Sequence, residues 1–252
     1  MSAQDRPADI PSRQAAGRAT ARSAVYAALS ALLAADEAGL TAVRSRLLPV
    51  LAEAGSSSEA VERAAATLMA ALGQSADAEL LRSQRSLLPP VESTELPACE
   101  SVYWGSDIFR QAQQMADIAG FYRAQGLVVG GARRERPDHI SVELEFMAFL
   151  TTKEADALLH LGPDQVQMSR HAQALFLAEH LGRWTPIFSR RLAGRAADGP
   201  FRLVAETLEA WIAAELAEHA VTALPPEAPA TELPLVAAAA DGQGFDRGGA
   251  SG

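Results

Sequence analysis

The stretch PDHISVELEFM, residues 137–147, combines a strongly apolar helical pattern with a cluster of ionisable side chains. Its apolar positions, together with Phe149, fall on two helical faces: Ile140, Leu144 and Met147 on one, and Val142, Phe146 and Phe149 on the other. A helix that is apolar nearly all round belongs at the centre of a globular protein. Asp138 follows Pro137 directly and stands where we expect the N-cap of this helix.

The same stretch places Asp138, His139, Glu143 and Glu145 among apolar residues. Burying a polar group without a partner costs on the order of 1 to 3 kcal/mol, and a charged group costs more. One interpretation is an internal network, in which Asp138 caps the helix and the glutamates pair with Arg133, Arg134 or Arg136. The other is an acidic patch beside an apolar groove, which suits a peptide that carries arginines followed by an apolar stretch. Both interpretations can hold at once.

Helical spacing of apolar residues recurs on both sides of this centre. We expect two short antiparallel helices over residues 25–51, separated by a break at Gly39, and a helix over 59–73 that begins behind a capping box of Ser56 and Glu59. Further helices are expected over residues 77–88, 108–126 and 166–182, from Thr185-Pro186 onward and from Pro200 onward. One apolar stripe is expected for the helix before Gly126: Ile108, Ala112, Met115, Ala119 and Tyr122.

These patterns define the fold class and the domain organisation. Val, Ile and Thr are too scattered to form alternating runs, so we expect an all-α, single-domain bundle of roughly eight to ten helices. Residues 1–20 are expected to be a disordered N-terminal extension and residues 21–220 the helical domain. Residues 221–252 are rich in Pro, Ala and Gly, and their prolines and then glycines deny any helical period, which predicts a disordered tail.

Composition excludes several classes of function. The net charge of -9 argues against sequence-independent binding of nucleic acid, which needs clustered Lys and Arg. No apolar run is long enough for a membrane span, and the first residues lack the apolar core of a secretory signal, so we expect a cytoplasmic protein. The single cysteine, Cys99, cannot form an internal disulfide.

Catalytic and metal-binding signatures are missing from the sequence. It contains no phosphate-binding loop, no HExxH zinc pair and no GxSxG elbow, and its five histidines show no ligand spacing. We therefore expect neither an enzyme nor a bound cofactor or metal. The alternatives are an accessory subunit of a larger enzyme, or a small-molecule enzyme that uses Asp138, His139 and Glu143 as acid and base.

Four segments in order resemble the TorD/DmsD family of redox-enzyme maturation chaperones: CESVYWG (99–105), ADIAGFYRAQGL (116–127), PDHISVELEFM (137–147) and FLAEHLGRWTPIFSRRL (176–192). The second and third are most similar to the branch that serves type II members of the dimethyl sulfoxide reductase family. The resemblance covers about half of the chain, and His180 and Trp184 also match family positions. The chain departs from the family at Leu87 and Leu88, where many members carry an aromatic pair.

The resemblance implies a TorD-like helical domain, monomeric or homodimeric, whose partner is a molybdopterin-enzyme precursor. Such a chaperone binds the twin-arginine leader and the apoprotein of the catalytic subunit, assists cofactor insertion and delays export. The family's leader-recognition motif falls on Asp138 and His139, with Glu143, Glu145 and Tyr103 as neighbours.

Overall fold

The computed structural model describes residues 9–34, 37–47, 49, 59–73, 75–88, 95–105, 107–128 and 136–226. Its elements follow the order α1 (Ile10–Leu33), α2 (Glu37–Ala42), η2 (Val43–Leu47), α4 (Glu59–Gly73), α5 (Asp77–Leu87), η3 (Glu100–Trp104), α6 (Ile108–Ala124), α7 (Ile140–Asp156), η4 (Ala157–Leu161), α8 (Pro163–Phe176), η5 (Leu177–Leu181), α9 (Gly182–Ala196) and α10 (Pro200–Glu218). Within these ranges there is no strand, only an isolated antiparallel bridge between Cys99 and His139. The all-α prediction is confirmed.

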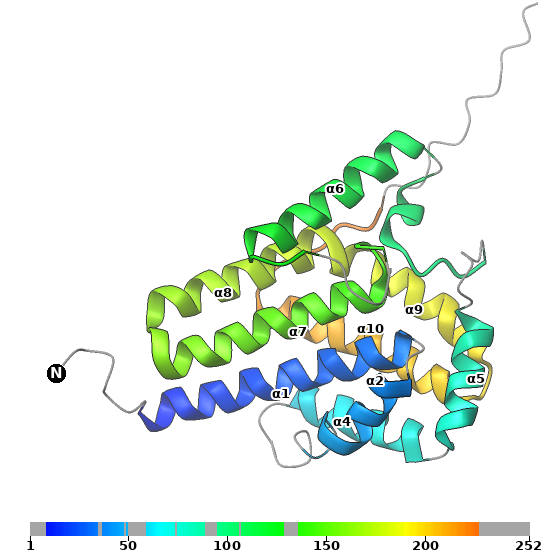
Figure 1. Cartoon of the computed structure of the whole chain (residues 1–252), viewed down its shortest axis with the longest axis horizontal. Coiled ribbons are helices and arrows are strands. Elements are labelled where there is room, and N and C mark those ends of the chain that lie inside the picture. The colour runs from blue at the N-terminus through cyan, green and yellow to red at the C-terminus, as the bar shows by residue number, and fades with distance from the viewer. Residues whose placement is uncertain are drawn as a thin grey trace, which may run out of the picture.

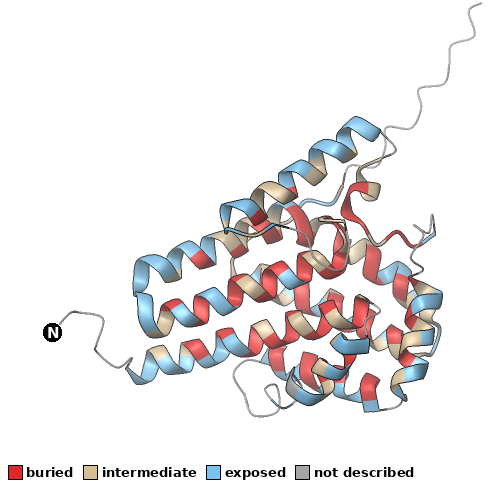
Figure 2. Ribbon diagram, in the orientation of Figure 1, coloured by how far each residue is buried: buried red, intermediate tan, exposed pale blue. Residues whose placement is uncertain are grey.

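Helix α7 lies at the centre of the bundle, as its apolar pattern predicts. It packs along α1 on one side and α8 on the other (Figure 1). Ile140, Leu144 and Met147 are fully buried, and the red faces of α1 and α7 meet in the core (Figure 2). The Ser30 hydroxyl donates to the backbone oxygen of Ser141 at 2.8 Å, which ties the two helices together. This packing fixes the start of α7, where the ionisable cluster lies.

Helix α1 begins earlier than the sequence pattern suggested. The Asp9 carboxylate accepts a hydrogen bond from the backbone N–H of Ser12 and caps the helix, and Pro11 lies in its first turn. Ala16 and Ala19 are buried. The prediction of a disordered extension up to residue 20 is therefore wrong from residue 10 onward. Residues 1–8 lie outside the described residues.

Two other predicted boundaries are also wrong. Gly39 lies inside α2 rather than at a break, because α1 already ends at Leu33. Pro186 lies inside α9 instead of starting it, because the π-helical turn η5 leads directly into a helix that begins at Gly182. The Thr185 hydroxyl donates to the backbone oxygen of Leu181 at 2.7 Å, as a side chain within a continuous helix does.

Helices α4, α5 and α10 confirm their predictions closely. α4 ends at Gly73, α5 covers residues 77–87, and α10 begins at Pro200 and closes the bundle with buried Phe201 and Trp211. Ser56 of the proposed capping box and residues 227–252 of the proposed tail lie outside the described residues. None of the helices in the described ranges is long and apolar enough to cross a membrane.

Helix α6 departs from the pattern in a way that bears on function. Of its predicted apolar stripe only Tyr122, at the carboxyl end, is buried, and its neighbour Ile118, which lies outside that stripe, is buried too. Ile108 and Phe109, in its first turn, are 72% and 83% exposed. The helix lies at the outer edge of the bundle (Figure 1) and packs chiefly against η3. The amino-terminal half of α6 thus presents apolar side chains to solvent.

Candidate functional site

Asp138 is fully buried, and its carboxylate does not cap α7. It accepts hydrogen bonds from Arg136 Nε and Nη2, both at 2.9 Å, and from the backbone N–H of Ser101 at 3.1 Å. His139 is the N-cap of α7, since its side chain accepts from the backbone N–H of Ser141. The prediction that Asp138 caps α7 is wrong, because its side chain turns to the first turn of η3.

Backbone hydrogen bonds fasten the same corner. The Glu100 N–H donates to the Asp138 backbone oxygen at 2.8 Å, and the Ile140 N–H donates to the Ala98 oxygen at 2.8 Å. The bridge between Cys99 and His139 lies between these two bonds. Residues 137–139 (PDH) therefore hold η3 against the start of the central helix α7. The two segments are more than thirty residues apart in the sequence.

Glu143 lies beneath this corner and is completely buried. Its Oε2 accepts a hydrogen bond from Trp184 Nε1 at 3.1 Å. Burial, and next the neighbouring Glu100 carboxylate, raise the pKa of Glu143 well above its usual range. The hydrogen bond from Trp184 opposes that rise only in part. A carboxyl group that burial makes hard to ionise therefore lies beside a second carboxyl in the interior.

Glu100 connects the cluster to the surface. Its carboxylate accepts hydrogen bonds from Trp104 Nε1 at 3.1 Å and from Gln114 Nε2 at 2.7 Å. His180 Nδ1 lies 3.2 Å from Glu100 Oε2. One buried carboxylate thus organises side chains from η3, α6 and η5. No sequence pattern marks Glu100 as functional, and His180 stands out only as a match to a family position.

Two buried polar atoms of the cluster have no hydrogen-bond partner among the described residues: Glu143 Oε1 and His180 Nε2. Asp117 Oδ2 is 3.6 Å from His180 Nε2, which is beyond a hydrogen bond. Such unsatisfied groups are few in folded proteins and often mark a functional site. We refer to Glu100, Asp138, Glu143 and His180 as the acid cluster.

Tyr103 and Glu145 lie at different places from the acid cluster. The Tyr103 hydroxyl donates to the Pro97 backbone oxygen at 2.9 Å, and its ring packs on Trp184 with centroids 5.1 Å apart. Partial burial raises the Tyr103 pKa to about 12. Glu145 is exposed on α7. The structure therefore brings Tyr103 to the edge of the buried group and leaves Glu145 outside it.

The predicted pairing of the glutamates with loop arginines is wrong for Arg136, which pairs with Asp138. Arg133 and Arg134 lie outside the described residues. Glu143 is paired instead with the Trp184 N–H, because α7 carries its side chain inward, toward α9.

A surface pocket of about 620 Å³ borders the acid cluster at Glu100 and His180. Its lining comes from η3 and α6: Trp104, Arg110, Gln113, Gln114, Ala116 and Asp117. Two of these side chains, Trp104 and Gln114, are held by the Glu100 carboxylate. The pocket therefore combines an aromatic wall with a basic and an acidic group at its rim, and we call it the α6 pocket.

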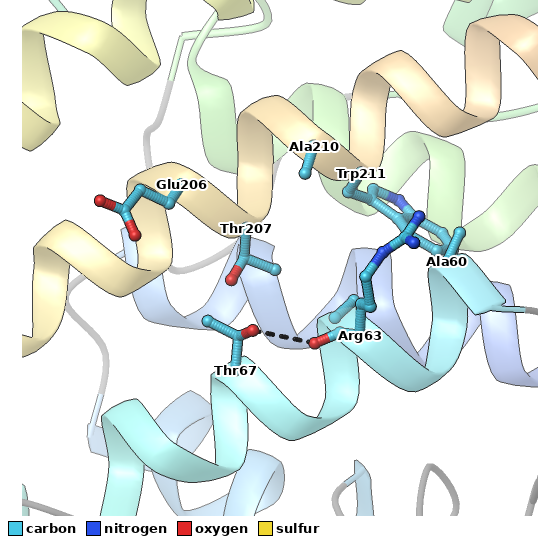
Figure 3. A pocket seen from close by; sticks show the side chains of 8 residues that line it. Ala60, Arg63, Thr67, Glu206, Thr207, Ala210 and Trp211 are labelled. Atoms are coloured by element: carbon cyan, nitrogen blue, oxygen red, sulfur yellow. Dashed lines mark hydrogen bonds between the residues drawn. The ribbon is translucent and has the colours of Figure 1, made fainter.

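A second pocket, of about 240 Å³, lies between α4 and α10 (Figure 3). Arg63 and Thr67 of α4 face Thr207 and Trp211 of α10 across it (Figure 3). The Thr67 and Thr207 hydroxyls donate to backbone oxygens of their own helices. None of the residues predicted as functional lines this pocket, so a substitution in it is a matched control for one in the α6 pocket.

Within the described ranges, no group of three or more His, Cys, Asp or Glu side chains is placed to hold a metal ion. The acid cluster has one histidine, but its carboxylates already accept hydrogen bonds from Arg136, Trp184, Trp104 and Gln114. The arrangement is that of a polar support under a surface pocket.

Comparison with known proteins gives consistent matches. The model of the family described as nitrate reductase delta subunit matches residues 55–190, more than half of the chain. The chain is 35% identical over 103 residues to the perchlorate reductase assembly chaperone protein of Dechloromonas aromatica, which covers 40% of this chain and 45% of that protein. It is 31% identical over 103 residues to the chaperone protein TorD of Vibrio cholerae, covering 41% of this chain and 44% of TorD.

A third relative is the selenate reductase assembly chaperone protein of Thauera selenatis. It is 37% identical over 78 residues, which cover 31% of this chain and 39% of that protein. The chain thus spans less than half the length of these curated relatives.

Proposed function

Since this chain belongs to the nitrate reductase delta subunit family, we propose that it is a system-specific chaperone that binds the precursor of a molybdopterin enzyme's catalytic subunit. The predicted kinship with the TorD chaperones is confirmed by the match to TorD of Vibrio cholerae. In this proposal the chain is a binding protein without catalytic activity of its own. It works in the cytoplasm, before export of its client.

The observation that carries the proposal is the placement of the acid cluster. All four of its residues lie within the range that the family model matches. Glu100 holds Trp104 and Gln114, which line the α6 pocket, and Asp138 holds the first turn of η3. A buried support of this kind keeps a binding surface in one shape, which reduces the entropic cost of binding.

The α6 pocket suits a peptide with arginines next to an apolar stretch. Asp117 at its rim is 64% exposed and offers a carboxylate for a charge-assisted hydrogen bond. Trp104 and the exposed Phe109 offer apolar area. The net charge of -9 favours the approach of a basic leader over an acidic one.

The predicted recognition residues divide into two roles in this proposal. Asp138 and Glu143 are buried and act through the groups they position. His139 and Tyr103 are half-buried and Glu145 is exposed, so these three contact the leader or the body of the client. The mechanism is a difference in affinity: the chaperone binds the unfilled precursor and releases it once cofactor insertion has completed folding.

Within the family, the two sequence segments at residues 116–127 and 137–147 favour a client of the type II dimethyl sulfoxide reductase class. The relatives named for perchlorate and selenate reductases are consistent with this branch. We propose a client that reduces a small oxyanion, bound by a monomer or homodimer of this chain.

The family's description as a delta subunit favours a second candidate, an accessory subunit that stays with the finished enzyme. The two candidates differ in which form of the client they hold. Affinity-tagged chain is purified from wild-type cells and from cells blocked in molybdopterin synthesis. A chaperone co-purifies with the apoprotein in the blocked cells and is nearly free in the others, whereas a stoichiometric complex with the filled enzyme supports the accessory subunit.

The enzyme alternative, with Asp138, His139 and Glu143 as acid and base, receives no support from the geometry. The Asp138 carboxylate is occupied by Arg136 and Ser101, and it is fully buried. A general base needs to reach the substrate proton within hydrogen-bond distance.

A further inference from the structure

The chain after α10 turns back over the bundle instead of leaving it. The Val221 N–H donates to the Leu216 backbone oxygen at 3.0 Å, and the Arg183 Nε donates to the Leu224 backbone oxygen at 2.7 Å. Gly182 permits this close approach, because a Cβ there would lie 3.0 Å from the Cβ of Ala223 and 2.5 Å from the Leu177 oxygen. Figure 1 shows this segment, in orange, running from α10 toward α6 and η3.

The same arginine joins this segment to the α6 pocket. The Arg183 guanidinium carbon lies 3.8 Å from the centroid of the Trp104 ring, in cation–π contact, while its Nε holds Leu224. Trp104 forms a wall of the pocket. Leu224 is therefore anchored within the span of one arginine side chain from the pocket, and its own side chain is 69% exposed.

The sequence that follows carries a suitable occupant. Residues 233–240 read LPLVAAAA, an apolar run preceded by Glu232 and followed by Asp241. Six residues, 227–232, separate this run from the last described residue. A chain of that length spans at most about 20 Å, which is ample for a pocket that begins beside the anchor.

We propose that the apolar run at residues 233–240 occupies the α6 pocket when no client is bound, as an internal competitor of the client's leader. The competition with a client's leader rests on the proposed function, whereas the occupancy of the pocket by residues 233–240 does not. Arg110 at the pocket rim makes no ion pair with any residue the structure describes, and Glu232 supplies a carboxylate of opposite charge next to the run. Both a leader and this run offer an apolar stretch to the same aromatic wall.

Tethering gives even a weak contact an effect on client binding. A short connection holds a segment at an effective concentration on the order of a millimolar. If the isolated run binds with a Kd of about 100 µM, the tether lowers the apparent affinity for a leader about ten-fold. A client that also contacts the chaperone elsewhere overcomes this factor, whereas a leader-like peptide from another protein does not.

Photo-crosslinking tests the occupancy without a client. A benzophenone amino acid replaces Gln113, an exposed residue of the pocket lining, in the full chain. The matched control carries it at Met168, which is 64% exposed on α8. The proposal predicts an intramolecular crosslink from position 113 to peptides within residues 230–243, and none from position 168. The absence of that crosslink, or its appearance only between isotopically labelled and unlabelled copies, overturns it.

Two further variants test the competition. One variant lacks residues 227–252, and the other carries Leu235→Asp and Val236→Asp in the full chain. In both, the crosslink should be lost and the affinity for the leader should rise about ten-fold. Unchanged leader affinity in both variants overturns the competing role. If the crosslink forms but no leader binds even the shortened chain, the occupancy stands and the proposed function is what fails.

Discussion

Two buried polar networks in the molecule differ in how completely they are paired. In the first, Arg22 of α1 donates to Glu154 of α7 at 2.9 Å, and to both carboxylate oxygens of Glu215 of α10 at 2.8 and 2.7 Å. Gln173 and His219 complete its hydrogen bonds. In the acid cluster, two carboxyl groups face each other, and Glu143 Oε1 and His180 Nε2 have no hydrogen-bond partner among the described residues.

The difference separates a structural network from a functional one. The Arg22 network joins four helices, and together with Arg170, which also pairs with Glu154, its two cations match its two carboxylates, so it stabilises one arrangement of the bundle. The acid cluster keeps an unsatisfied, hard-to-ionise carboxyl under a surface pocket. A perturbed buried acid beside a cavity is a feature of functional sites more often than of structural ones.

The networks also respond to pH in opposite directions. Arg22, aided by Arg170 and Gln173, lowers the pKa of Glu154 despite the opposing effect of burial. Glu154 therefore contributes stability that is present above its unfolded pKa and is lost as the pH falls. The pKa of Glu143 is raised, so the native state holds a proton that the unfolded chain has released, and stability falls as the pH rises above about 4.5.

The largest effect is expected from Arg22→Met. The substitution leaves Glu154 and Glu215 in the interior without their shared cation, which costs about 3 to 5 kcal/mol of unfolding free energy. Urea unfolding followed by circular dichroism measures this loss. The control is Arg63→Ala, whose exposed pair with Glu59 contributes at most about 0.5 kcal/mol. Equal losses in the two variants would show that the Arg22 network is not structural.

Glu143→Gln is expected to act through pH. Because the variant cannot release the proton, it loses the decline of stability above the unfolded pKa, which amounts to about 1.4 kcal/mol per pH unit for one group. Unfolding free energies at pH 5, 6 and 7 should therefore fall less steeply in the variant than in the wild type. Parallel pH profiles would mean that Glu143 is ionised in the native state.

Asp138→Ala is expected to destabilise the chain by about 1 to 3 kcal/mol, because Arg136 and the Ser101 N–H lose their common acceptor. The loss should be local. Hydrogen exchange of the η3 amides is expected to increase more than that of α7. If α7 frays first, the helix start rather than η3 depends on Asp138.

The smallest effect is expected from Glu145→Gln. Because Glu145 is exposed, the unfolding free energy should change by less than about 0.5 kcal/mol. Leader binding should weaken about two- to five-fold at low salt, and the difference should shrink as salt rises. A loss of binding that salt does not alter would point to a contact other than an ion pair.

The sequence predicted those parts of the fold that depend on periodic large apolar residues. Helices α5, α7 and α10 begin or end within a residue or two of their predicted bounds. The start of α1 could not be predicted because its buried face there is made of Ala16 and Ala19, and alanines occur equally in a solvated helix. The exposure of the first half of α6 could not be predicted, since apolar spacing does not tell whether a neighbour covers the stripe.

The site could be predicted only in its local part. Asp138 and Glu143 stand out because they interrupt an apolar run. Glu100 and His180 meet across a sequence separation of 80 residues, and no local spacing signals such a contact. That His139 rather than Asp138 caps α7 could not be predicted from the local sequence either, because η3 competes for the Asp138 carboxylate.

Calorimetric titration of the full chain with the twin-arginine leader of the molybdoenzyme encoded nearest to its gene tests the central claim most directly. Wild type is compared with Trp104→Ala in the α6 pocket and with Thr67→Ala in the pocket between α4 and α10. We predict micromolar binding that Trp104→Ala weakens at least about ten-fold, as an aromatic anchor does, and that Thr67→Ala leaves unchanged. Equal binding by all three folded proteins, or none by the wild type, would contradict leader recognition at the α6 pocket.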